Sequence, residues 1–113
     1  MDLQQLIELQ TEFDKRHAAN KQFYVPINSS NPQDLEHLVV CMLGELGEFA
    51  NILKKVVRGD LSYEHAEPLL HEELTDIFIY LMKVAGQSGV DLEARYLEKL
   101  QKNECRFAHW SKP

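Results

Sequence analysis

Two pairs of acidic residues with the same spacing are the most chemically informative feature of this 113-residue sequence. Glu45 precedes Glu48 in the first pair, and Glu73 precedes Asp76 in the second. Each pair lies in an apolar run with helical periodicity, where a carboxylate is costly unless a cation or a donor compensates it. Residues i and i+3 of an α-helix point in similar directions. Each pair therefore places two carboxylates on one side of a helix.

The two pairs also occupy the same position relative to the apolar face of their helices. On a helical wheel Glu48 falls ~300° from Glu45, and Asp76 falls ~300° from Glu73, while both apolar stripes cover roughly 20° to 120°. If the stripes pack antiparallel, the four carboxylates converge, and such oxygen ligands suit hard divalent cations. A single pair is typical of a solvated helix face. Two pairs at the same offset favour a metal site.

Length and composition indicate one ordinary globular domain, with 44% apolar and 27% charged residues. The net charge of −6 argues against binding to a nucleic-acid backbone. The sequence lacks an apolar run long enough to cross a membrane, and its N-terminus does not resemble a signal peptide. Cys41 and Cys105 are in unrelated contexts, which favours a reducing compartment. We therefore expect a cytoplasmic protein without nucleic-acid or membrane partners.

The pattern predicts an all-α fold with four helices. The first covers about 3–20, and a loop follows over 21–32. The second begins with Asn31 as N-cap and Pro32 at its first position, and ends near Arg58 before Gly59. The third begins between Ser62 and Pro68 and runs to about Gln87, with a break or a short separate turn expected before Pro68. Gly86 and Gly89 are expected to end it. The fourth, capped by Asp91, covers 92–107. Residues 1–108 form the predicted domain, and 109–113 form a tail.

The third helix is apolar nearly all the way round, because Phe78, Ile79 and Met82 extend its stripe to roughly 240°. A helix of this kind is buried on several sides. We therefore expect a homo-oligomer, either a homodimer or a dimer of dimers. The alternative is a central helix covered by the other three helices of its own chain.

Longer segments around the acids resemble a known family. The stretches that carry the resemblance are GELGEFA at 44–50, EELTDIFIYL at 72–81, GVDL at 89–92, and KL with KNE at 99–104. They resemble the MazG-like all-α nucleoside triphosphate pyrophosphohydrolases over nearly the whole chain. Within that family, the sequence is most similar to the single-domain branch that includes the dCTP pyrophosphatases. The fold that the resemblance implies is a MazG-like four-helix bundle.

The resemblance also implies a reaction, the hydrolysis of a (deoxy)nucleoside triphosphate to the monophosphate and pyrophosphate. It implies that Glu45, Glu48, Glu73 and Asp76 bind Mg²⁺, for which Mn²⁺ is a possible substitute. Carboxylates agree with this metal, since Mg²⁺ prefers oxygen ligands. One of the four, with Glu48 as our candidate, would orient the attacking water as a general base. Nucleotide-pool housecleaning is the implied role.

Four further residues are candidates for binding the substrate. Lys99 and Asn103 match a lysine and an asparagine that lie near the triphosphate in the family, and Tyr80 matches an aromatic that lines its nucleotide pocket. Lys55 stands where the dCTP pyrophosphatases have a large aromatic, so the preferred base stays open. The alternatives to the hydrolase are a phosphoribosyl-ATP or dUTP type of pyrophosphohydrolase, and a non-catalytic bundle that binds nucleotides or proteins.

Overall fold

Four α-helices account for most of the computed structural model, in which residues 1–112 are described. The helices are α1 (Leu3–Lys15), α2 (Pro32–Val57), α3 (Tyr63–Gln87) and α4 (Leu92–Arg106), and the short 3-10 helix η1 (Ala108–Trp110) follows. Within residues 1–112 the one β-type contact is an isolated bridge between Ala18 and Gln22. The predicted all-α fold class is confirmed, and the four helices are consistent with a four-helix bundle. None of the helices described is both long and apolar enough to cross a membrane.

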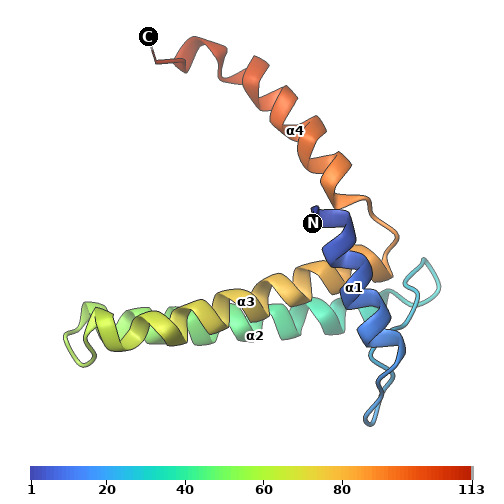
Figure 1. Cartoon of the computed structure of the whole chain (residues 1–113), viewed down its shortest axis with the longest axis horizontal. Coiled ribbons are helices and arrows are strands. Elements are labelled where there is room, and N and C mark those ends of the chain that lie inside the picture. Colours follow the sequence, from blue (N-terminus) through green and yellow to red (C-terminus); the bar gives the residue numbers. More distant parts are fainter. Residues whose placement is uncertain (113) are drawn as a thin grey trace.

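The two long helices α2 and α3 form an antiparallel hairpin and run side by side (Figure 1). Pro32 begins α2 as predicted, although the side chain of Asn31 makes no capping hydrogen bond. The turn at the other end depends on Gly59, whose φ of 85° lies in the region that favours glycine. Buried residues from both helices lie along the hairpin, including Leu38 from α2 and Leu70 from α3. The hairpin is the frame that carries the acids.

Helix α3 continues without a break through Pro68, so the predicted interruption is wrong. Ser62 caps this helix, because its hydroxyl accepts a hydrogen bond of 3.2 Å from the His65 N–H. Pro68 has no N–H to donate to the carbonyl of Glu64, which lies in the exposed first turn and can be hydrated instead. The helix therefore loses one hydrogen bond near its start and keeps its direction.

Helix α1 crosses the C-terminal half of α3. Ile7 of α1 packs there with Met82 and Ala85 of α3. At the crossing, a Cβ atom on Gly86 would lie 2.8 Å from Thr11 Oγ1, so glycine allows the close approach. Gly86 thus lies inside α3 instead of ending it, and Gly89, with a φ of 68°, follows the helix.

The first helix is shorter than predicted and ends at Lys15 instead of Asn20. The imidazole Nδ1 of His17 lies 2.6 Å from the carbonyl oxygen of Phe13, the acceptor that the next helical N–H would use. Residues 16–31 then return to α3, where Gln87 holds them. Its side chain accepts from the Val25 N–H at 3.2 Å and donates to the Phe23 carbonyl at 3.0 Å.

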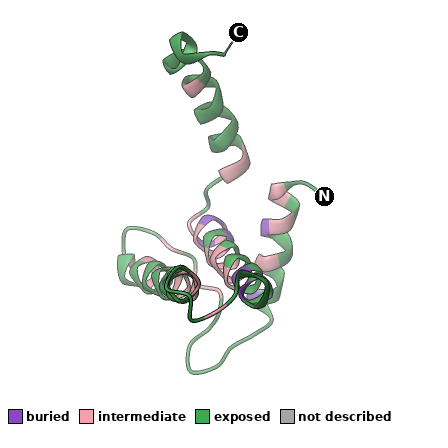
Figure 2. Cartoon of the chain, turned by 90° about the vertical axis from the view of Figure 1, so that its left-hand side faces the viewer, coloured by how far each residue is buried: buried purple, intermediate pink, exposed green. Residues whose placement is uncertain are grey.

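Helix α4 projects away from the other three helices (Figure 1), and its main contacts are with α1 and η1. Its residues are mostly exposed, in contrast to the buried positions on α1 and α3 (Figure 2). Asp91 caps this helix as predicted, since its carboxylate accepts the Ala94 N–H at 3.1 Å. The radius of gyration is 17.5 Å, against about 13 Å for a compact chain of this length. The single chain is therefore extended, because the long α2–α3 hairpin and the projecting α4 point in different directions (Figure 1).

Candidate functional site

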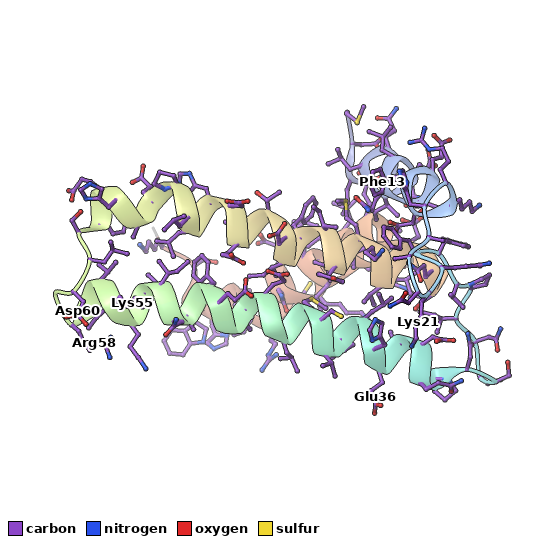
Figure 3. The ribbon with its side chains drawn as sticks, turned by 90° about the horizontal axis from the view of Figure 1, so that it is seen from below. Phe13, Lys21, Glu36, Lys55, Arg58 and Asp60 are labelled. Atoms are coloured by element: carbon purple, nitrogen blue, oxygen red, sulfur yellow. The ribbon has the colours of Figure 1, made fainter. Side chains whose placement is uncertain are left out.

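The α2–α3 hairpin brings the two acidic pairs together. Carboxylate oxygens of Glu45, Glu73 and Asp76 all lie within 4.8 Å of one another, and each of these residues is half-buried. Antiparallel packing of the two apolar stripes places the acid-bearing edges opposite each other, as the helical wheel predicts. Figure 3 shows α2 and α3 side by side, with side chains from both helices in the space between them. The arrangement joins residues that are far apart in the sequence at one point.

Glu48 completes the group from a more exposed position. It lies on the same edge of α2 as Glu45, and it contributes to raising the pKa of Glu73. Glu48 is exposed, whereas the other three acids are half-buried. We call Glu45, Glu48, Glu73 and Asp76 the acid quartet. Its members thus differ in their access to water.

Glu73 is the most perturbed member of the acid quartet. Its pKa is raised from 4.5 to about 7, first by a hydrogen bond with Glu45, then by burial, and then by Glu48. Its Oε2 atom is buried and has no hydrogen-bond partner among the described residues. Like charges at this separation cannot all ionise at low cost unless a cation lies among them. The orphaned oxygen and the raised pKa both fit the requirements of a divalent cation.

One cavity opens beside the acid quartet and a second lies next to it. The first, which we call the acid cavity, has a volume of about 260 Å³ and is lined by residues of α1, α2, α3 and the 16–31 segment: Gln10, Phe13, Asp14, Phe23, Glu45, Asp76, Ile79, Tyr80 and Lys83. The second, the loop cavity, has a volume of about 460 Å³ and lies between residues 19–25, the start of α2 and the end of α3. Phe23, Tyr80 and Lys83 line both cavities. The two spaces are therefore neighbours and share one wall.

Tyr80 lies at this shared wall, close to the acid quartet. Burial raises the pKa of its hydroxyl group, and Cys41, Glu45 and Asp76 raise it further. A phenol in this position stays protonated and can donate a hydrogen bond. Tyr80 thus lines both cavities beside the acids. The role in a nucleotide pocket that the resemblance implies for it stays a prediction.

Lys83 is the residue of the site that the sequence analysis missed. Its ammonium group lies 3.0 Å from Asp14 Oδ1 and 3.3 Å from the carbonyl oxygen of Phe23. The signal was present in α3, because Glu73, Asp76, Tyr80 and Lys83 follow one another at intervals of three and four residues. Asp14 gave no such signal, since its place depends on how α1 crosses α3.

Three of the predicted substrate residues lie away from the acid quartet in the single chain. Lys55 is near the turn that joins α2 to α3, close to Arg58 and Asp60 (Figure 3). Lys99 and Asn103 lie on α4, which points away from the hairpin (Figure 1). The chain's own fold therefore does not bring the α4 residues to the acids. Their predicted role stays a prediction.

Comparisons with known proteins find dCTP pyrophosphatases among the relatives of this chain. Human dCTP pyrophosphatase 1 is 31% identical over 91 residues, which is 77% of this chain and 48% of the human protein. The mouse dCTP pyrophosphatase 1 is 30% identical over the same length. The Gene 37 protein of Mycobacterium phage L5 is 34% identical over 80 residues, which is 66% of this chain and 69% of the phage protein. This chain spans about half the length of the dCTP pyrophosphatases that it matches. No family profile and no solved structure matches it.

Proposed function

This chain belongs to the MazG-like family of all-α nucleoside triphosphate pyrophosphohydrolases, and we propose that it hydrolyses a (deoxy)nucleoside triphosphate to the monophosphate and pyrophosphate. The observation that carries the proposal is the convergence of carboxylate oxygens from α2 and α3 within 4.8 Å. A nearby cavity and a half-buried tyrosine supply space and a donor for a nucleotide. We further propose that the reaction removes unwanted or damaged nucleotides in the cytoplasm.

The proposed cofactor is Mg²⁺, with Mn²⁺ as a substitute, and the acid quartet would hold it. When bound, the metal supplies neutralisation of phosphate charge and activation of water. Glu48 is our candidate for the general base, because its exposed carboxylate is accessible to water beside the three half-buried acids. Tyr80 would donate a hydrogen bond to the nucleotide from the shared wall of the two cavities. The neutral tyrosine adds no negative charge near the phosphates.

We also propose that the active form is a homo-oligomer. The exposed surface of the chain is 8534 Å², against about 6,400 Å² for a compact monomer of this mass. Large apolar side chains are exposed, including Val40 and Leu43 on α2 and Leu74 on α3, all more than half exposed. Packing against a second copy would bury such side chains. It would also allow Lys99 and Asn103 of one copy to reach the acid quartet of the other.

A panel of canonical and modified nucleoside triphosphates tests the proposed reaction. Purified protein in Mg²⁺ is expected to release pyrophosphate from at least one of them, and chelation is expected to stop the reaction. Phosphoribosyl-ATP and dUTP belong in the panel, since exclusive turnover of either would assign the chain to that type of pyrophosphohydrolase. No pyrophosphate from any of these compounds would reject the proposed reaction in favour of a non-catalytic bundle.

A further inference from the structure

Lys83 is the single cation among the described residues that line the acid cavity. It belongs to α3 and lies two turns after Asp76, so the axial distance between their Cα atoms is about 10 Å. The Cα–Cβ bonds of a helix tilt toward its N-terminus, so the Lys83 side chain leaves α3 on the side of Asp76. Its ammonium group then contacts Asp14 and the Phe23 carbonyl. The acid cavity otherwise contains three carboxylates, those of Asp14, Glu45 and Asp76. A polyanionic ligand in this cavity would meet one protein cation.

The Lys83 ammonium is held in place before any ligand binds. The side chain is 11% exposed, and its partner Asp14 is 3% exposed at the side chain. Asp14 Oδ1 also accepts a hydrogen bond of 2.9 Å from Gln10 Nε2, which fixes the carboxylate. Within residues 1–112 the ammonium contacts two acceptors, Asp14 and the Phe23 carbonyl, and it also lies 5.4 Å from the centre of the Phe23 ring. One of its three N–H donors therefore has no oxygen acceptor and can bind a ligand. A fixed donor loses little entropy when a ligand binds.

Lys83 also lies at the boundary between the two cavities. It lines the acid cavity together with Glu45 and Asp76, and the loop cavity together with residues 19–25 and His37. If the phosphates lie beside the acids, the nucleoside extends into the larger loop cavity. The phosphate next to the sugar would then lie at the boundary between the two cavities, beside Lys83. This is the phosphate that the monophosphate product keeps.

We propose that Lys83 binds the phosphate next to the sugar, and that Asp14 is the positioning residue that holds its ammonium at the shared wall. The inference rests on the proposed function, since it assigns a further substrate contact in the same site. The competing explanation is a structural ion pair that only ties α1 to α3. Buried ion pairs often contribute little net stability. Stabilisation of the fold alone is therefore a weak explanation for the buried pair of Lys83 and Asp14.

The test compares binding of two ligands that differ by one phosphate. These are the nucleoside monophosphate product of the triphosphate that the wild type hydrolyses, and the corresponding nucleoside. Lys83→Met is expected to weaken monophosphate binding in Mg²⁺ by about tenfold to a hundredfold, the range for a hydrogen bond to a charged group. Nucleoside binding is expected to stay within about twofold. Calorimetry measures both, and KM for the triphosphate should rise with the monophosphate Kd.

Two further variants keep the test decisive. Lys83→Met alone leaves Asp14 unpaired and buried, so Asp14→Asn/Lys83→Met removes both charges and protects the fold. Lys54→Met is the matched control, because Lys54 lies ~180° from Glu45 on α2. Unchanged monophosphate binding in the folded double variant, or equal loss for both ligands, would overturn the assignment of Lys83. A wild type that hydrolyses no triphosphate would instead reject the proposed function.

Discussion

The α2–α3 hairpin and helix α4 carry different halves of the proposed site. They differ in whether the fold of one chain brings their residues together. The hairpin brings Glu45, Glu73 and Asp76 together by its own packing. Helix α4 keeps Lys99 and Asn103 on a projecting, mostly exposed element. The proposed metal-binding half thus lies within one chain. The substrate-binding half on α4 depends on what packs against that helix.

The largest expected effect comes from removing one charge of the acid quartet. Asp76→Asn should abolish turnover, and Glu48→Gln should lower kcat by about a hundredfold to ten-thousandfold if Glu48 is the general base. Both variants should keep the helical circular dichroism of the wild type, because the changed groups contribute to no core packing. Initial rates with the preferred triphosphate measure the effect.

The matched control is Glu36→Gln. Glu36 is an exposed acid of α2 that lies ~180° around the helix from Glu45. Figure 3 shows Glu36 pointing away from α3. Its rate should stay within about twofold of the wild type, as for surface substitutions in general. Equal activity in Asp76→Asn and Glu36→Gln would contradict the role of the acid quartet.

A subunit-mixing experiment sharpens the comparison between the hairpin and α4. Lys99→Met is expected to lower kcat/KM by about tenfold to a hundredfold if it contacts phosphate. When it is mixed with Asp76→Asn and the subunits are allowed to exchange, about a quarter of the wild-type activity should return. Half of randomly formed dimers are mixed, and each would contain one intact site.

Two observations would count against this shared site. Light scattering that gives a 13.1 kDa species at micromolar concentration would exclude the oligomer. Stable dimers that exchange subunits and recover no activity would show that Lys99 does not act across the interface. Lys102→Met serves as the control on α4, where we interpret this lysine as part of a solvated face.

A smaller effect concerns the pH dependence of folding without metal. The pKa of Glu73 is raised to about 7 in the folded protein from its ordinary 4.5. The folded state therefore binds this proton more tightly than the unfolded state does. The stabilising contribution is complete below pH 4.5 and is lost as the pH rises through about 7.

Urea unfolding of the metal-free wild type and of Glu73→Gln at several pH values measures this contribution. The wild type should lose stability relative to the variant between about pH 4.5 and 7. Because metal binding must displace the same proton, Mg²⁺ affinity should rise over that range. A stability difference that does not vary with pH would show that Glu73 is not perturbed in the folded chain.

The smallest expected effect separates α4 from the hairpin. Asp91→Ala removes the carboxylate that caps α4 and should cost about 1 kcal/mol of local helix stability. Hydrogen exchange should speed up in the first turns of α4, while Mg²⁺ binding to the hairpin stays unchanged. Altered Mg²⁺ affinity in this variant would mean that α4 supports the metal site directly.

The arrangement of the hairpin could be predicted from the sequence because it depends on helical periodicity and on residues that begin or end a helix. Glu45 and Glu73 occupy the same offset from their apolar stripes, so antiparallel packing alone brings them together. Pro32 and Gly59 mark the ends of α2 by rules of backbone geometry. The all-α class follows from the same periodicity.

The remainder depends on contacts that no local pattern encodes. The side chain of His17 ends α1 early by taking the carbonyl of Phe13, and Asp14 meets Lys83 where α1 crosses α3. Pro68 stays within α3 although its ring removes a hydrogen bond. The position of α4 relative to the acids is likewise set by long-range packing. The sequence could therefore suggest Lys99 and Asn103 as substrate residues, but could not predict their distance from the acids.

The measurement that tests the central claim most directly is a calorimetric titration of Mg²⁺ into the purified metal-free protein. Saturable binding to the wild type, lost in Asp76→Asn and kept in Glu36→Gln, is the predicted result. If neither Mg²⁺ nor Mn²⁺ binds to the wild type in this titration, the result would contradict a metal site between α2 and α3.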